Sequence, residues 1–263
     1  PTLEVQFIMY KEKNMMIHPV LENLRALRLV GAAQALEMQL QNTASQDLTF
    51  EERLSLLVDY EKSFREQRRL QSRLKKAKFR NQACIPDIIY DPFRKLDKSL
   101  ILNLENCLWI KEHKNILITG ATGTGKSYIA EALAHSACLK EVHVLRVQFP
   151  RILHDLTAAK GDGGYARLQA QLCKVELLLI DDFGIAPFSD ENRRDFLEIA
   201  DERYNRKSTI ITSQLPVSNW HEAIGDSTLG DAILDRLIHH AYRISLEGES
   251  MRKKQRVGVH EKA

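Results

Sequence analysis

One stretch of the sequence combines the residue types and the spacing needed to bind phosphate groups. Residues 120–127 read GATGTGKS, which fits the phosphate-binding pattern G-x-x-x-x-G-K-[ST]. Its three glycines let the backbone curl so that successive N–H groups point into one concavity, and a following helix adds the positive end of its dipole. The predicted nucleotide site consists of Gly120, Ala121, Thr122, Gly123, Thr124, Gly125, Lys126 and Ser127.

The last two residues of this loop have the most specific chemistry. We expect the Lys126 ammonium to reach the β- and γ-phosphates of ATP, and the Ser127 hydroxyl to ligate Mg²⁺. An apolar run at 116–118 precedes the loop and an alanine-rich segment at 128–139 follows it. These flanks predict the strand, turn and helix that the motif requires, which a chance glycine-rich turn would lack.

A second candidate lies where an apolar run ends in two acids, because residues 177–182 read LLLIDD. Ligands of open α/β sheets bind beyond the carboxyl ends of the strands. We expect Asp181 to hold Mg²⁺, directly or through water. Asp182 stands where many ATPases place a glutamate that orients the attacking water, and its side chain is shorter. Two acids that merely cap a strand end are the alternative.

Gln214 follows a β-branched run at 208–213. We interpret it as a candidate sensor of the γ-phosphate that hydrogen-bonds the nucleophilic water. Ser213 competes for this role, and a plain turn before Pro216 is the structural alternative.

Arg236 is a candidate arginine finger that would stabilise charge on the transferring phosphoryl group from a neighbouring subunit. The alternative is a surface arginine that pairs with Asp231 or Asp235. Arg252 has a weaker signal for a similar sensing role.

Positive charge is concentrated in one short segment. Between Lys62 and Arg80 there are nine basic residues and one acid, Glu66, whereas the whole chain carries a net charge of only +3. Such a stripe suits salt-dependent contact with nucleic-acid phosphates, and without interleaved aromatic residues we expect largely non-specific binding of duplex DNA. Docking on an acidic partner is the alternative. The candidate DNA-binding residues are Arg65, Arg68, Arg69, Arg73, Lys75, Lys76, Lys78 and Arg80.

The bulk properties indicate a cytoplasmic protein. Hydrophobic residues make up 44% of the 263 residues, yet no apolar run approaches the ~18 residues of a membrane span. The four cysteines are far apart in sequence, which argues against a zinc site or a disulfide framework. Residues 1–14 do not resemble a secretory signal and are interpreted as a leader or an expression remnant.

The elements that must position these residues fall into two groups. Helical periodicity runs over 18–41, and a capping box at Thr49 and Glu52 begins a long helix that continues toward Arg80. Further along, short apolar strands alternate with helices, which predicts an α/β fold with a parallel five-stranded sheet covered by helices. We expect a helical DNA-binding domain at 15–90, an ATPase core at 91–254 and a tail at 255–263. The expected strands are 115–119, 142–147, 177–181, 208–213 and 241–246.

Several of these motifs together resemble the IstB/DnaC branch of the AAA+ ATPases, over nearly all of residues 16–254. The N-terminal pattern is similar to IstB rather than to DnaC. The motifs are GATGTGKS at 120–127, LIDDFG at 179–184, TSQLP at 212–216, DRL at 235–237, FEERL at 50–54 and REQRRL at 65–70.

IstB is the helper ATPase of an insertion-sequence transposon. The resemblance implies ATP-dependent self-association on duplex DNA, recruitment or stimulation of a transposase, and an AAA+ core with little or no C-terminal lid. The main alternative is a DnaC-like helicase loader, whose N-terminal domain grips a replicative helicase. A small-molecule kinase is disfavoured because the basic residues lie outside the P-loop core.

Overall fold

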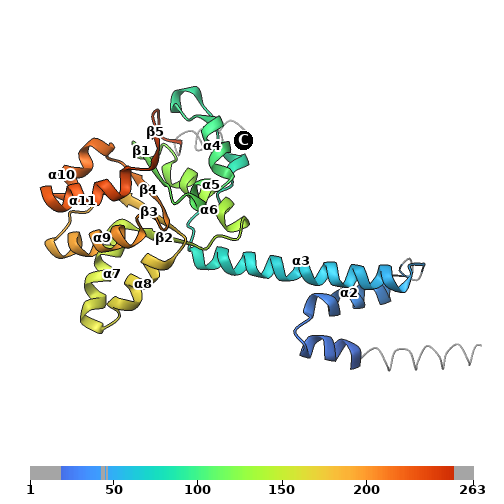
Figure 1. The fold of residues 1–263 in the computed structure, drawn as a ribbon. Helices are drawn as coiled ribbons and strands as arrows, with labels where there is room; N and C mark the ends of the chain where they lie inside the picture. Colours follow the sequence, from blue (N-terminus) through green and yellow to red (C-terminus); the bar gives the residue numbers. More distant parts are fainter. Residues whose placement is uncertain (1–18, 43–44, 46, 252–263) are drawn as a thin grey trace, which may run out of the picture. The chain divides into compact units, whose positions relative to one another are not determined.

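The computed structural model describes residues 19–42, 45 and 47–251 (Figure 1). Arg252 and the expected segments 1–14 and 255–263 lie outside the described residues. Packing divides the chain into two compact units, which join between Ser72 and Arg73. Residues 73–90, which the sequence placed with the helical domain, therefore pack with the α/β unit. No helix in the described ranges is both long and apolar enough to cross a bilayer.

The first unit is helical. A helix over residues 19–26 is followed by α2 (Val30–Gln41) and by the first part of α3 (Phe50–Ala77). The periodicity expected over 18–41 is interrupted at residues 27–29, where Arg28 adopts a left-handed φ of 61°. Gly31 permits the close approach of α2 and α3, because a Cβ there would lie 2.7 Å from the Phe64 Cβ.

The capping box predicted for α3 is confirmed. The Thr49 N–H donates to Glu52 Oε2 at 2.8 Å, and the Glu52 N–H donates to Thr49 Oγ1 at 3.3 Å. This reciprocal pair satisfies N–H groups that a helix start leaves without intrahelical partners. The helix then runs for 28 residues, which corresponds to about 42 Å at 1.5 Å per residue.

The second unit is built on a five-stranded sheet, as predicted. Its strands lie in the order β2-β3-β4-β1-β5, and every neighbouring pair is parallel. The β1 strand, which leads into the P-loop, lies between β4 and β5, and β3, which carries the two acids, is separated from it by β4 alone. The strands are β1 (Asn115–Gly120), β2 (Val144–Gln148), β3 (Leu177–Phe183), β4 (Ser208–Ser213) and β5 (Ala241–Leu246).

Helices cover both faces of this sheet (Figure 1). Helix α6 (Lys126–Leu139) lies against strands β1 to β4, and α4 (Lys98–Glu105) packs on α6. Helix α4 belongs to a stretch in which we expected no helix, together with α5 (Leu108–Lys111) and the short 3₁₀ turns at Ile85–Asp87 and Pro92–Arg94. The helices associated with the other face are α7 (Phe149–Asp162), α8 (Tyr165–Lys174), α9 (Asp190–Arg203), α10 (Trp220–Ile224) and α11 (Ser227–Ile238).

An aromatic cluster holds the carboxyl end of β3 in place. Phe183 follows the two acids directly, is fully buried, and lies 4.6 Å from Trp220 and 4.8 Å from Phe149 between ring centroids. Phe188 and Phe196 complete the cluster. Close-packed aromatic rings leave little room for the strand end to shift. The position of Asp181 and Asp182 is therefore determined by the core beneath them.

Candidate functional site

The P-loop has the curled backbone that its glycines predict. Gly120, Gly123 and Gly125 have φ values of 145°, 85° and 94°, which side-chain-bearing residues rarely adopt. A Cβ at Gly125 would lie 2.7 Å from an Arg94 nitrogen, and one at Gly123 would lie 2.2 Å from the Ser250 hydroxyl. Gly125 then caps α6, so the loop passes directly into a helix N-terminus suited to anions.

Lys126 lies at the base of this loop. The residue is only 6% exposed, and its ammonium donates to the Ala121 carbonyl at 2.8 Å. This hydrogen bond holds the charge across the loop that the phosphates are predicted to occupy. An ammonium at this position in the loop is suited to charge-assisted hydrogen bonds with phosphate oxygens.

Ser127 and Asp181 lie together, as their predicted shared role requires. The Ser127 hydroxyl donates to Asp181 Oδ1 at 2.7 Å, and the Thr212 hydroxyl on β4 donates to the same oxygen at 2.6 Å. Oxygen ligands from one carboxylate and one hydroxyl, completed by substrate phosphates and water, suit Mg²⁺. The described residues contain no cluster of three or more His, Cys, Asp or Glu that could hold a metal by themselves. The donor set thus fits a metal that arrives with its nucleotide.

Asp182 has an unusual backbone for its residue type. Its φ is 63°, and the β3–β4 register shifts between Ile180 and Phe183. The Asp182 N–H donates to the Thr212 hydroxyl at 3.1 Å, and Gln148 donates to its carboxylate at 3.3 Å. Left-handed non-glycine residues cost energy and are concentrated at functional sites. The irregularity turns Asp182 away from the strand alternation and into the pocket beside the P-loop.

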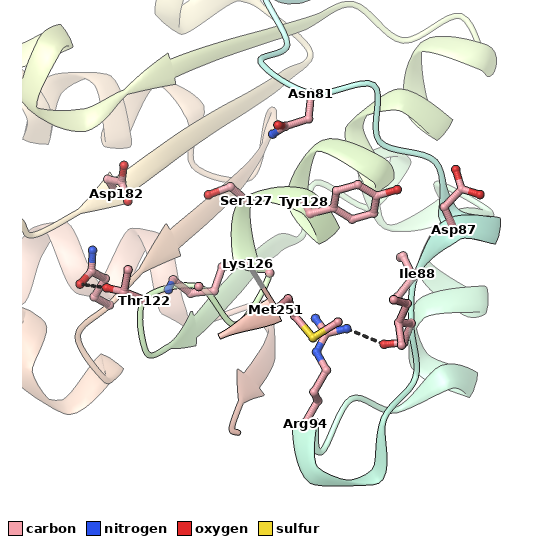
Figure 2. A pocket seen from close by; sticks show the side chains of 14 residues that line it. Asn81, Asp87, Ile88, Arg94, Thr122, Lys126, Ser127, Tyr128, Asp182 and Met251 are labelled. Atoms are coloured by element: carbon pink, nitrogen blue, oxygen red, sulfur yellow. Dashed lines mark hydrogen bonds between the residues drawn. The ribbon is translucent and has the colours of Figure 1, made fainter. Parts of the chain in front are cut away.

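The P-loop, Asp182 and Gln214 border a pocket of about 540 Å³ (Figure 2). Its volume lies in the range typical of small-molecule and cofactor sites. One part is the P-loop with Asp182 and Gln214. The other part was not anticipated from the sequence and includes apolar and aromatic side chains. These additional lining residues are Asn81, Asp87, Ile88, Ile89, Arg94, Tyr128 and Met251.

Arg94 ties the two parts of the pocket together. Its guanidinium donates to the Thr124 carbonyl at 2.7 Å and to the Ile89 carbonyl at 2.5 Å. The residue is 5% exposed, and burial lowers the pKa of its guanidinium, although the Asp91 charge acts in the opposite direction. By holding the Thr124 carbonyl outward, Arg94 favours the loop conformation whose N–H groups face the pocket. A lone arginine before α4 gives no sequence signal for this role.

Gln214 lies at the pocket and Ser213 does not. The Thr122 hydroxyl donates to Gln214 Oε1 at 2.7 Å, which connects the end of β4 with the P-loop. The Ser213 hydroxyl instead donates to the Phe183 carbonyl at 2.7 Å and accepts the Leu215 N–H. Of the two candidate sensors, only Gln214 thus presents its side chain to the nucleotide pocket.

Arg236 is not brought to the nucleotide pocket of its own chain. It lies on α11, where it forms an ion pair with Asp201 of α9 at 2.9 Å and lies 3.9 Å from Asp235. It borders a separate small hollow with Asn115 and Tyr204. Arg236 could therefore contact a transferring phosphoryl group only in the nucleotide pocket of a neighbouring subunit.

The candidate DNA-binding residues differ in exposure. Arg73 has a side chain that is 11% exposed and donates to the Cys138 carbonyl at the end of α6. The Arg68 guanidinium lies 5.9 Å from the centre of the Phe64 ring, and Arg65 pairs with Glu61. The exposed members of the set are Arg65, Arg68, Arg69, Lys75, Lys76, Lys78 and Arg80.

Comparison with known proteins identifies one family along most of the chain. A model described as IstB-like ATP binding protein matches residues 22–258. A Sinorhizobium fredii protein, named as an insertion sequence ATP-binding protein, is 48% identical over 242 residues, which span 92% of this chain and 99% of that protein.

Two solved structures have the same fold at low identity. AMPPCP-bound DnaA from Aquifex aeolicus aligns with a TM-score of 0.57 and 18% identity, over 71% of this chain and 57% of that one. The DnaC helicase loader aligns with a TM-score of 0.52 and 21% identity, over 63% of this chain and 97% of that one. These two likenesses establish the fold of the α/β unit.

Proposed function

The chain belongs to the IstB-like ATP-binding protein family, and we propose that it is an ATPase that assembles on duplex DNA and recruits or stimulates a transposase. The AAA+ fold and membership of the ATP-binding family identify the chain as an ATP-binding ATPase. The relatives named for insertion sequences support the transposition role. The observation that carries the ATPase is the meeting of two elements beside one pocket: Lys126 and Ser127 at the start of α6 line it, and the Ser127 hydroxyl donates to Asp181 near the end of β3.

In this proposal five polar side chains at or beside the pocket each have a role. Lys126 contacts the β- and γ-phosphates, while Ser127 and Asp181 hold Mg²⁺, which when bound offsets the negative charge of the phosphates. Asp182 orients the attacking water, and Gln214 hydrogen-bonds it beside the γ-phosphate. The apolar part of the pocket around Ile88 and Ile89 receives the nucleobase. The chain thus binds and orients ATP with groups that are already in place.

Arg236 is proposed to act across a subunit boundary. In its own chain it is paired with Asp201 and remains 31% exposed, so a neighbour can compete for it. A guanidinium supplied in trans stabilises charge that develops during phosphoryl transfer. Hydrolysis would then require self-association, and nucleotide occupancy would in turn control the assembly.

The exposed basic residues of α3 and the following turn are proposed to contact duplex DNA. Seven of the eight candidates are exposed, and Glu66 is the only acid between Lys62 and Arg80. Phosphate contacts of this kind carry little sequence information, so the binding is largely non-specific. Steep dependence on salt follows, because each neutralised phosphate releases counterions.

The test compares two double charge reversals in the full-length protein. Arg68→Glu with Arg69→Glu alters the exposed stripe, whereas Arg151→Glu with Lys174→Glu makes the same charge change on the α/β unit. We expect the first pair to weaken binding to a labelled duplex by about 100-fold at physiological salt, with a reduced salt slope. Equal effects of the two pairs would overturn the assignment of the stripe.

A helicase loader is the alternative function, supported by the fold of DnaC. Retained binding to a replicative helicase ring, without salt-dependent binding to duplex DNA, would favour it. Measuring binding to a helicase ring alongside binding to duplex DNA therefore separates the two proposals.

A further inference from the structure

A buried arginine connects Asp181 with a second carboxylate that the proposed chemistry does not use. Arg146, in the middle of β2, donates to Asp181 Oδ2 at 2.5 Å, and its Nε lies 2.9 Å from Glu131 Oε1. The side chains of Arg146, Glu131 and Asp181 are 10%, 1% and 3% exposed. Two buried carboxylates therefore share one guanidinium.

Glu131 in turn holds the chain that follows the basic helix. Its carboxylate accepts the Arg80 N–H at 3.2 Å, the Asn81 N–H at 2.8 Å and the Asn81 side-chain amide at 3.0 Å. These contacts begin three residues after the end of α3 at Ala77. A continuous series of charge-assisted contacts thus runs from Asp181 through Arg146 and Glu131 to the backbone of residues 80 and 81.

The two oxygens of Asp181 have different partners. Oδ1 accepts the Ser127 and Thr212 hydroxyls, whereas Oδ2 is bound by Arg146. Arg146 consequently sets the orientation of the carboxylate beside the proposed Mg²⁺ position. Mutation of a group that hydrogen-bonds a metal-binding side chain commonly lowers metal affinity by about 10–100-fold.

We propose that Arg146 is a positioning residue, which orients Asp181 for Mg²⁺ and transmits occupancy of the nucleotide site through Glu131 to residues 80 and 81. The physical basis is competition for one guanidinium. A bound Mg²⁺ would weaken the attraction between the Asp181 carboxylate and the Arg146 guanidinium. The guanidinium would then interact more strongly with Glu131. Because Glu131 Oε1 also accepts the Arg80 N–H, that hydrogen bond would change as well. Low dielectric makes such exchange between buried partners energetically significant.

The inference rests on the proposed Mg²⁺ role of Asp181, and amide hydrogen exchange in the full-length protein tests it. Exchange at Arg80, which unlike Asn81 does not line the pocket, is compared without ligand, with a non-hydrolysable ATP analogue alone, and with the analogue plus Mg²⁺. In the unmodified protein we expect Mg²⁺ with the analogue to change exchange at this amide by about fivefold or more. Mg²⁺ dependence of analogue binding is measured in parallel.

Four variants separate positioning from general destabilisation. Arg146→Gln should weaken the apparent Mg²⁺ affinity by about 10–100-fold and abolish the exchange response. Arg146→Lys should recover part of the Mg²⁺ affinity but not the response, because an ammonium lacks the planar fork that bridges two carboxylates. Glu131→Gln should abolish the response while leaving the Mg²⁺ affinity nearly unchanged. Arg193→Gln removes a comparably buried arginine from α9 and should change neither.

The outcomes distinguish this inference from the function on which it rests. Analogue binding that is independent of Mg²⁺ in the unmodified protein would overturn the role of Asp181, and the inference with it. Intact Mg²⁺ dependence with an unchanged exchange response in Arg146→Gln would overturn the inference alone. If Arg146→Gln fails to fold, Glu131→Gln decides: a response like that of the unmodified protein would contradict the connection.

Discussion

The Ser127 hydroxyl lies 2.7 Å from Oδ1 of Asp181, although 54 positions separate the two residues in sequence. This contact joins the first turn of α6 to the carboxyl end of β3. Thr212 donates to the same oxygen from β4. The side chains at the pocket are therefore held by a hydrogen-bond network of their own, which limits the reorganisation that nucleotide binding requires.

The Ser127 hydroxyl should be required for Mg²⁺ rather than for the fold. Ser127→Ala is expected to raise the Mg²⁺ concentration needed for half-maximal ATPase activity by about tenfold or more, because an oxygen ligand is lost. Ser127→Thr retains the hydroxyl that the motif allows and serves as the matched control. Titration of ATPase activity with Mg²⁺ checks this. An alanine variant with the same Mg²⁺ requirement would remove Ser127 from the metal site.

Asp182 should affect turnover more than binding. Asp182→Asn keeps a side chain that tolerates the left-handed backbone at φ 63° but removes the carboxylate. We expect kcat to fall by about 100-fold or more, with KM for ATP nearly unchanged. Steady-state kinetics measure both parameters. A variant that raises KM while kcat stays constant would show that Asp182 binds the ground state and does not orient water.

The proposed trans role of Arg236 can be tested by mixing two inactive variants. Asp182→Asn should still bind ATP but lacks the group that orients water, and Arg236→Ala lacks the finger. Random mixing would give about a quarter of the interfaces both an intact Asp182 and an intact neighbouring arginine. We expect ATPase activity to return in the mixture and not in either variant alone. Absence of recovery, with assembly confirmed, would contradict a finger supplied by a neighbour.

Glu61 should make the helical unit sensitive to acid. Burial alone would raise the pKa of this carboxyl, but the Ala32 N–H and Arg65 outweigh burial, and the net shift of its pKa is downward. A carboxyl with a lowered pKa stabilises the fold above its unfolded value near 4.5, and this contribution is lost as the pH falls through the folded pKa.

The corresponding measurement is thermal unfolding of Glu61→Gln against the exposed control Glu66→Gln. At pH 7 we expect Glu61→Gln to be less stable by about 1–3 kcal/mol, since a buried charged acceptor for the Ala32 N–H is lost. The difference from the unmodified protein should shrink below pH 4.5. A difference that stays constant between pH 7 and pH 3.5 would contradict the role of the ionised carboxylate.

The sheet and the phosphate part of the pocket could be predicted because both have local signatures. Short apolar runs marked the strands, and GATGTGKS combined with LIDD identified residues from two elements that meet at one sheet edge. The parallel direction of the strands followed from the alternation of strands and helices along the sequence.

Other features depend on contacts that leave no periodic pattern in one sequence. Arg146 occurs within an apolar strand, which signals a buried charge but not its two partners. The base side of the pocket comes from short 3₁₀ turns and loop residues such as Ile88 and Met251. The left-handed backbone of Arg28 and the close approach of α2 and α3 at Gly31 likewise have no signature in the helical periodicity of the sequence.

Sedimentation velocity with a duplex of mixed sequence tests the central claim, ATP-dependent assembly on DNA, most directly. The unmodified protein is compared with Lys126→Ala in the presence of a non-hydrolysable ATP analogue with Mg²⁺, and in ADP. We predict large protein–DNA assemblies only for the unmodified protein with the analogue, and their loss in Lys126→Ala. A protein that remains monomeric and unbound to the duplex in every nucleotide state would contradict the account.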